Sequence, residues 1–193
     1  ISSDKAVRPS NIMGATKRLA ELLCHSYNTS KYKTKFSVVR FGNVMNSSGS
    51  VIPLFKQQIS NGGPVTVTDK NVERFFMSTS EAIKLVLKTI EISKGGEIFL
   101  LDMGRQIKIL DLAKKMIHLS GYNFFLDNQK NKKKPNQIEI KFVGLRSGEK
   151  MSEELSLNKN LKPSKIKGIL VTNEKVIAYK AIKKILTELK TYC

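Results

Sequence analysis

The 193-residue sequence has few cysteines, few acidic residues and no long apolar run. Its two cysteines, Cys24 and Cys193, are spaced for neither a disulfide framework nor a metal site, so we expect a reducing, cytosolic setting. No apolar stretch approaches the roughly 20 residues that a membrane helix needs, and no signal peptide opens the chain. A Gly-x-Gly-x-x-Gly loop, which would hold the pyrophosphate of a dinucleotide, is also missing.

The shortage of acidic residues leaves a strongly basic chain. Lys and Arg total 34 against 16 Asp and Glu, which gives a formal net charge of +18. Such a balance invites a nucleic-acid or membrane-surface interpretation. However, the excess is mostly lysine spread along the chain, which is typical of a solvated surface. The lysine-rich stretch 127–137 has no interleaved aromatics, so we predict a solvated loop and no nucleic-acid partner.

Apolar periodicity predicts alternating helices and strands. Helical spacing indicates a helix at about 11–28 with Ser10 as its cap, and further helices at about 51–61, 79–93, 109–120 and 173–190. Short β-rich runs predict strands at 36–41, 65–68, 97–101 and 138–143. This alternation indicates an α/β architecture, and no internal repeat is visible.

The first residues suggest that the chain is the back part of a longer protein. Ile1-Ser2-Ser3 has no initiator Met and resembles the end of a buried strand that runs into a functional loop. The segment that follows places Asp4 beside Lys5, ahead of a helix on which Met13 and Lys17 share one face at i, i+4 spacing. Taken alone, these would be a surface ion pair, a core methionine and a solvated lysine.

Five motifs in order change that interpretation. They are Ser3-Asp4-Lys5-Ala6 with the helix that starts near Asn11, Arg40-Phe41-Gly42-Asn43-Val44, the Ser48–Phe55 run, Gly63–Thr68, and Gly144-Leu145-Arg146-Ser147-Gly148-Glu149-Lys150. Over about residues 1–155 the sequence resembles the extended short-chain dehydrogenase/reductase enzymes of bacterial polysaccharide biosynthesis, the nucleotide-sugar 4,6-dehydratases.

The resemblance implies a partial Rossmann-like fold that lacks the amino-terminal Gly-rich βαβ half and carries a smaller α/β substrate-binding lobe. Residues 1–45 would be the end of the NAD-binding lobe. Residues 46–160 would form mainly the nucleotide-sugar-binding lobe with some returning elements, and 161–193 would be a basic, helical carboxyl-terminal extension.

The implied reaction acts on UDP-N-acetylglucosamine or a related UDP-sugar. NAD, rather than NADP, takes hydride from C4, water leaves across C5–C6, and hydride returns at C6. Removing the C5 proton needs a base and expelling the C6 hydroxyl needs an acid. By the family's pattern, Asp4 is the acid and Lys5 the base. Lys17 holds the nicotinamide ribose and supplies positive charge, and the other cofactor-binding positions are Ser3, Arg40 and Asn43.

One catalytic position departs from the common pattern. Most short-chain dehydrogenases have Tyr four residues before the lysine, and the thioether of Met13 cannot exchange a proton as a phenol does. Methionine here is the form of the large membrane-anchored branch that resembles these dehydratases, so it points to that branch rather than to inactivity. Ser3, Asp4 or a water are the candidates for the proton of the C4 hydroxyl.

The matched motifs also imply a set of substrate-binding residues: Asn43, Val51, Pro53, Val65, Val67, Arg74, Arg146 and Glu149. Asn43 would lie near the sugar diphosphate, and the two arginines suit bidentate phosphate contacts. Glu149 would accept from the ribose hydroxyls, with Val65 and Val67 beside the uracil.

Two classes of function stay open. The first is a nucleotide-sugar dehydratase, with a 5-epimerising dehydratase or a 4-epimerase as its near alternatives. The second is a basic fragment without catalysis, which the missing Gly-rich half and Met13 favour and which binds nucleic acid or anionic lipid. We expect no metal site, because His25 and His118 lack partners at ligand spacing. We further expect a homo-oligomer in the cytoplasm, held at the inner membrane only through an anchor in a missing amino-terminal part.

Overall fold

The computed structural model describes residues 1–28, 33–127, 135–157, 161–174 and 177–192. The chain forms two compact units. The first unit contains Ile1–Gly42, Ser80–Met103 and Glu154–Cys193, and the second contains Asn43–Thr79 and Gly104–Glu153. Most of the predicted basic loop, residues 128–134, lies outside the described residues. Among the described helices, none is both long enough and apolar enough to span a membrane.

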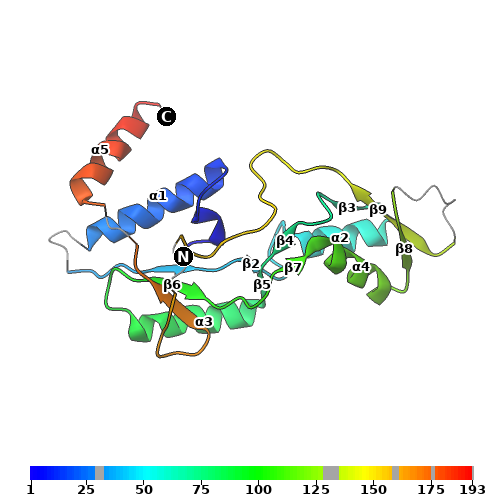
Figure 1. Cartoon of the computed structure of the whole chain (residues 1–193), viewed down its shortest axis with the longest axis horizontal. Helices are drawn as coiled ribbons and strands as arrows, with labels where there is room; N and C mark the ends of the chain where they lie inside the picture. Colours follow the sequence, from blue (N-terminus) through cyan, green and yellow to red (C-terminus); the bar gives the residue numbers. More distant parts are fainter. Residues whose placement is uncertain (29–32, 128–134, 158–160, 175–176, 193) are drawn as a thin grey trace. The chain divides into compact units, whose positions relative to one another are not determined.

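The first unit is built on a four-stranded sheet (Figure 1). Its strands follow the order β1 (Val38–Arg40), β6 (Ile98–Leu101), β11 (Ile169–Thr172) and β10 (Lys162–Pro163). β1 and β6 are parallel and wholly buried, as their apolar runs predict, and β11 joins β6 antiparallel. Ile1–Asp4 runs beside β1, because the Ser2 and Asp4 amides donate to Val39 and Phe41 carbonyls at 2.8 and 3.2 Å.

Helices of the first unit are η1 (Asp4–Ala6), α1 (Ile12–Tyr27), α3 (Thr79–Ile92) and α5 (Tyr179–Lys190). The N-cap of α1 is Asn11 and not the predicted Ser10, since the Asn11 side-chain oxygen accepts from the Gly14 amide at 2.8 Å. The carboxyl-terminal segment differs from the expected helical extension. It supplies the strands β10 and β11, and its helix starts at Tyr179, six residues later than predicted.

The second unit holds a three-stranded parallel sheet in the order β3 (Val65–Val67), β9 (Gln137–Phe142) and β8 (Asn123–Leu126). Two short pairs accompany it: β2 (Asn43–Val44) with β5 (Phe76–Met77), and β4 (Glu73–Arg74) with β7 (Ile107–Lys108). Its helices are α2 (Val51–Ser60) and α4 (Ile109–Leu119). The sequence patterns predicted β3, β9 and both helices but missed β8.

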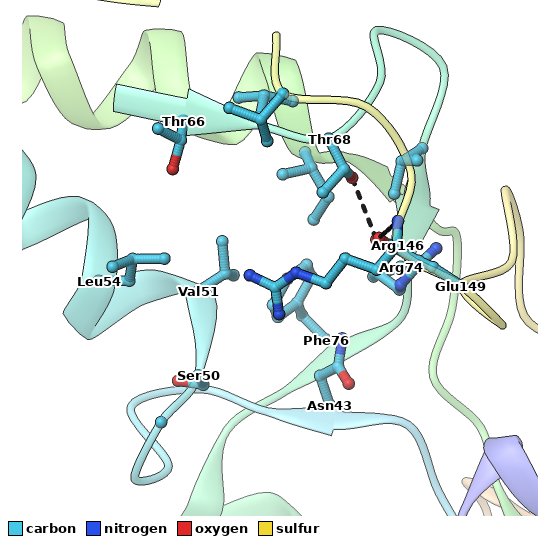
Figure 2. Close-up of a pocket in the computed structure, with 15 residues that line it drawn as sticks. Asn43, Ser50, Val51, Leu54, Thr66, Thr68, Arg74, Phe76, Arg146 and Glu149 are labelled. Carbon is cyan, nitrogen blue, oxygen red and sulfur yellow. Dashed lines mark hydrogen bonds and ion pairs between the residues drawn. The ribbon is translucent and has the colours of Figure 1, made fainter. Parts of the chain in front are cut away.

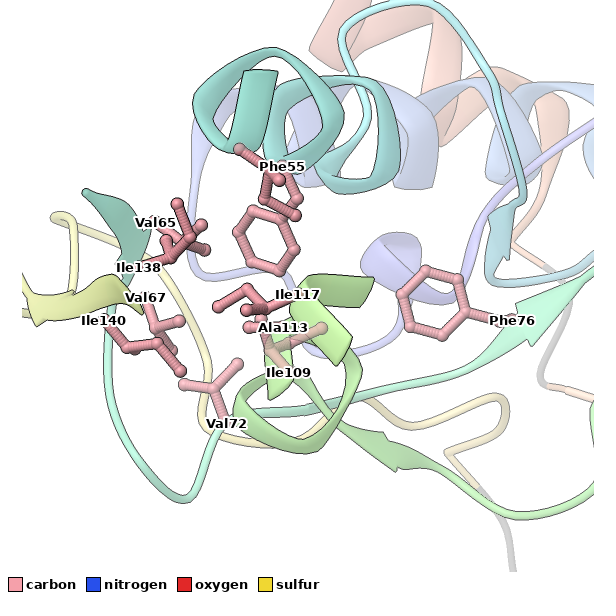
Figure 3. Packing of buried hydrophobic residues seen from close by; sticks show 11 residues of the cluster. Phe55, Val65, Val67, Val72, Phe76, Ile109, Ala113, Ile117, Ile138 and Ile140 are labelled. Carbon is pink, nitrogen blue, oxygen red and sulfur yellow. The ribbon is translucent and has the colours of Figure 1, made fainter. Parts of the chain in front are cut away.

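A hydrophobic cluster holds the second unit together (Figure 3). Phe55 from α2 and Ile117 from α4 are fully buried against the side chains of β3 and β9, among them Val65 and Ile140. Each fully buried side chain of this size contributes about 1.5–3 kcal/mol. The cluster therefore fixes α2 and β3 relative to each other, and these two elements carry Gln58 and Thr66.

Candidate functional site

Ser3, Asp4 and Lys5 form a hydrogen-bonded cluster in the first unit. The Ser3 hydroxyl donates to Asp4 Oδ1 at 2.8 Å, and Lys5 Nζ donates to the same oxygen at 3.0 Å. Ser3 also caps η1, because its Oγ accepts from the Lys5 amide at 3.3 Å. The Asp4 side chain is fully buried, and its Oδ2 has no hydrogen-bond partner among the described residues. One carboxyl oxygen of Asp4 is thus enclosed in the first unit without a hydrogen-bond partner in the described part of the chain.

Gly14 allows α1 to approach this cluster closely. A Cβ on Gly14 would lie 2.4 Å from the Lys5 carbonyl oxygen and 3.1 Å from the Pro9 Cβ. No side chain fits at that distance, so glycine is required where the helix touches the turn. Met13 and Lys17 follow on α1. Met13 is 48 % exposed, which rules out the core role that such a methionine usually has. Lys17 is also exposed.

Arg40 does not have the surroundings that its predicted role in cofactor binding needs. Its side chain is fully buried, with Nε and Nη2 each 2.7 Å from a carboxylate oxygen of Glu21. Nη1 and Nη2 reach the Glu174 carboxylate at 2.6 and 3.2 Å. The guanidinium therefore links β1 to α1 and to the segment after β11. Its role is structural.

The opposite charges of Arg40 and of the carboxylates Glu21 and Glu174 stabilise one another. Burial by itself would raise the pKa of Glu21 and of Glu174, but the hydrogen bonds and charge of Arg40 bring both pKa values below their ordinary range. Burial would lower the pKa of Arg40, and the same two carboxylates raise it instead. Arg18 adds contacts of 2.9 Å to Glu21 and 2.6 Å to Glu174.

The second unit contains a pocket of about 260 Å³ (Figure 2). Six of the eight predicted substrate-binding residues line it: Asn43, Val51, Val67, Arg74, Arg146 and Glu149. Pro53 and Val65 are not among the lining residues. Val65 is fully buried in the hydrophobic cluster, so its predicted place beside a base is wrong.

The two pocket arginines differ in availability. Arg74 is 8 % exposed and donates to the Glu73 and Met151 carbonyls at 2.8 and 3.2 Å, and to Glu149 Oε1 at 3.1 Å. Both terminal nitrogens of the Arg74 guanidinium thus already donate hydrogen bonds within the protein. Arg146 is exposed, and its guanidinium has no ion pair within the described part of the chain. Arg146 is the better placed of the two to receive an anion.

Glu149 is held in place by three donors. Its Oε1 accepts from Arg74 and from the Thr68 hydroxyl at 3.0 Å, and its Oε2 accepts from the Arg146 amide at 3.2 Å. A carboxylate oriented this way keeps further lone pairs for a ligand hydroxyl. The Arg74 side chain therefore helps to position the Glu149 carboxylate.

Sequence reasoning missed several pocket residues, among them Leu54, Thr66, Thr68 and Phe76. Strand alternation could have found Thr66, because it must face away from Val65 and Val67, which point into the core. Thr66 is tied to Gln58 of α2: Gln58 Nε2 donates to Thr66 Oγ1 at 2.7 Å, and the Thr66 amide donates to Gln58 Oε1 at 3.0 Å.

Comparison with known proteins assigns the chain to a family. A family model described as polysaccharide biosynthesis protein matches residues 1–174. The chain belongs to this family. It is 56 % identical over 160 residues to the capsular polysaccharide biosynthesis protein CapD of Staphylococcus aureus, covering 83 % of this chain and 25 % of that protein.

Two relatives with named reactions are more distant. The UDP-N-acetylglucosamine 4,6-dehydratase (inverting) of Campylobacter jejuni is 36 % identical over 156 residues, with 79 % of this chain and 41 % of that protein covered. The UDP-glucose 4-epimerase of Rickettsia canadensis is 40 % identical over 157 residues, with 80 % and 42 % covered. The chain therefore covers between 25 % and 42 % of the length of these three relatives.

Solved structures confirm the fold. The X-ray structure of Pen from Bacillus thuringiensis has a TM-score of 0.74 and 32 % identity, covering 97 % of this chain and 60 % of that one. DesIV, a dTDP-glucose 4,6-dehydratase from Streptomyces venezuelae solved with NAD and TYD bound, has a TM-score of 0.63 at 16 % identity, covering 80 % and 49 %. The chain thus has the partial Rossmann-like, extended short-chain dehydrogenase fold that the motifs predict.

Proposed function

We propose that this chain supplies the acid–base residues and the nucleotide-sugar pocket of a UDP-N-acetylglucosamine 4,6-dehydratase. The observation that carries the proposal is the buried Asp4 carboxyl. It has one oxygen bound by Lys5 and Ser3 and the other without a partner among the described residues. An elimination of water needs both an acid and a base, and a carboxyl beside a part-exposed lysine supplies groups of both kinds.

The two residues divide the elimination between them. The Lys5 amine removes the proton from C5, and the electron pair of that C–H bond forms the C5=C6 double bond. The C6–O bond breaks as the Asp4 carboxyl protonates the leaving hydroxyl, which departs as water. The 3.0 Å contact between Lys5 Nζ and Asp4 Oδ1 then provides a path for the proton to pass from lysine to aspartate.

The residues of this chain fit only one end of NAD. Lys17 is exposed on α1 and suits the nicotinamide ribose, while the Gly-rich turn for the pyrophosphate is missing from the sequence. Bound NAD would supply the hydride acceptor at C4 and the donor at C6. The thioether of Met13 cannot take the C4 hydroxyl proton, so Asp4 Oδ2, which has no partner among the described residues, is our candidate for it.

The pocket of the second unit suits a UDP-sugar. Arg146 offers an exposed guanidinium for phosphate, and Glu149 offers an oriented carboxylate for ribose hydroxyls. Leu54 and Val51 provide the apolar surface that a base needs. Asn43 at the start of β2 is a further polar contact for the sugar diphosphate.

A UDP-sugar 4-epimerase is the second candidate, because relatives of 40 % identity carry that name. Epimerisation at C4 needs no proton removal at C5 and no loss of the C6 hydroxyl. The Asp4–Lys5 pair would then have no such task, and for this reason we favour the dehydratase.

A chimera tests the proposal. The matched residues of the C. jejuni dehydratase are replaced by those of this chain, and the product from UDP-N-acetylglucosamine is identified by NMR in deuterated water. We expect a 4-keto-6-deoxy sugar that carries solvent deuterium at C5. Lys5→Ala should abolish C5 exchange while UDP-sugar binding persists. The control Lys84→Ala, which changes an exposed lysine on α3, should leave both C5 exchange and UDP-sugar binding unchanged.

A chimera that binds UDP-N-acetylglucosamine and NAD but releases the C4 epimer would support the second candidate. No reaction despite such binding, together with salt-sensitive binding of nucleic acid or anionic lipid by this chain, would favour the non-catalytic interpretation.

A further inference from the structure

The Gln58–Thr66 contact determines how the Thr66 hydroxyl can bond. The orientation of the Gln58 side-chain amide is unambiguous. The Thr66 backbone N–H can only donate, so the Gln58 atom that faces it at 3.0 Å must be the oxygen Oε1. The other end of the amide, Nε2, then faces Thr66 Oγ1 at 2.7 Å and must be the donor. The Thr66 oxygen accepts this bond, so its own hydrogen points elsewhere.

That hydrogen has no acceptor in the described part of the chain. Thr66 is half-buried and lines the pocket, and Figure 2 shows its oxygen directed from β3 toward the space beside Leu54. A ligand carbonyl placed there would accept the hydrogen. A ligand amine at the same place would be a second donor facing the Thr66 hydroxyl. The hydroxyl hydrogen would then lack an acceptor, which would weaken binding.

We propose that Thr66, oriented by Gln58, is a specificity-determining residue that donates to the C4 carbonyl of a uracil base and selects against cytosine. This inference rests on the proposed UDP-sugar function of the pocket. Figure 2 shows Thr66 and Leu54 on one side of the pocket and the Arg74–Glu149 pair on the other. With the ribose at Glu149, the base edge farthest from the ribose meets Thr66. In a pyrimidine that edge carries the C4 substituent, whereas O2 lies next to the ribose-bearing nitrogen.

UDP and CDP are the probes, because they share the ribose and diphosphate and differ only at the C4–N3 edge of the base. Isothermal titration of the 193-residue chain with each measures the ratio of their dissociation constants, from which phosphate contacts cancel. We expect UDP to bind about tenfold more tightly, as one satisfied hydrogen bond against one unsatisfied hydroxyl implies. Thr66→Val should bring the ratio near one, and Thr66→Ser should restore it.

Gln58→Glu provides an independent test that does not alter the threonine. A glutamate can still accept the Thr66 amide hydrogen, but its second oxygen accepts from the Thr66 hydroxyl and turns that hydrogen away from the ligand. The preference for UDP should therefore fall below that of the native chain. Gln57→Glu is the matched control, because it adds the same charge at an exposed neighbouring position on α2 and should leave the ratio unchanged.

The outcomes distinguish an error in the role of Thr66 from an error in the function of the pocket. If UDP binds and the ratio is the same in the native chain, Thr66→Val and Gln58→Glu, the role of Thr66 is refuted while the UDP-sugar pocket stands. If the folded native chain binds neither diphosphate, the proposed function fails and the role of Thr66 fails with it. If Gln58→Glu lowers the UDP preference and Gln57→Glu does not, the orientation by Gln58 is supported even where Thr66→Val unfolds.

Discussion

Replacing Arg40 with methionine should destabilise the first unit by about 3–5 kcal/mol, the usual effect of removing one partner from a buried ion pair. Methionine fills a similar volume but leaves the Glu21 and Glu174 carboxylates, which are 2 % and 5 % exposed, without their main donor. Arg18 still reaches both and offsets part of the loss. The effect is large beside a total stability of about 5–15 kcal/mol for a typical domain.

Urea denaturation followed by circular dichroism measures this change without tryptophan, which the sequence lacks. Arg18→Met is the matched control. It removes one bond to each of the same carboxylates but from a side chain that is 19 % exposed, so we expect a loss of only about 1 kcal/mol. A variant with Arg40→Met, Glu21→Leu and Glu174→Leu should regain most of the stability, because no buried charge is left unpaired.

The pH dependence gives a second measurement. In the native chain the folded pKa values of Glu21 and Glu174 are lowered, so their contribution is present above 4.5 and is lost as pH falls through the folded values. In Arg40→Met burial should instead raise both pKa values, so the variant loses stability as pH rises above 4.5. The difference between the two proteins should therefore shrink on acidification. An Arg40→Met loss no larger than that of Arg18→Met, or one that does not change with pH, would refute this account.

Three further predictions concern other parts of the chain. Gly14→Ala ordinarily stabilises a helix interior by about 1 kcal/mol, but here its Cβ meets the Lys5 carbonyl, and thermal denaturation should show a net loss of about 1–3 kcal/mol. Any gain in stability would contradict the close approach of α1 to the turn. Burial lowers the pKa of His25 from 6.5, so the folded state disfavours the charged ring, and stability should fall as pH drops from 6.5 toward the folded value. His25→Gln should flatten the stability profile over that range, and an unchanged profile would exclude His25 as its cause. Arg146→Ala should weaken UDP binding about tenfold or more, as loss of a charge-assisted phosphate contact implies, whereas the control Arg105→Ala, at an exposed position outside the pocket, should not. Equal calorimetric affinities for the two variants would exclude Arg146 as the phosphate contact.

Local sequence patterns were sufficient for the regular elements and for the family. Unbroken apolar runs predicted β1 and β6, and helical periodicity predicted α1, α2, α3 and α4 to within about two residues. The patterns missed the four-residue strands β8 and β11 and the two-residue strands β2, β4, β5, β7 and β10. Strands of two to four residues carry too little periodicity to be distinguished from loops, and they form because another strand pairs with their backbone.

Side-chain roles depended more on tertiary structure. An arginine at the end of a buried strand can face a cofactor or another part of the protein, and the sequence does not say which. Arg40 is structural because Glu21 and Glu174, far apart in the chain, meet around it. The same is true of Val65 and Thr66. Strand alternation puts their side chains on opposite faces of β3, but only the packing of α2 shows which face belongs to the core.

The sequence by itself determined the α/β class, the family motifs and the candidate acid–base pair, because these depend on residues adjacent in the chain or one helical turn apart. Only the tertiary structure decided which of two pocket arginines is available, which carboxyl oxygen of Asp4 has no partner among the described residues, and how Gln58 orients Thr66. Hydrogen-bond saturation and burial are properties of groups that come together from distant segments, and no local pattern records them.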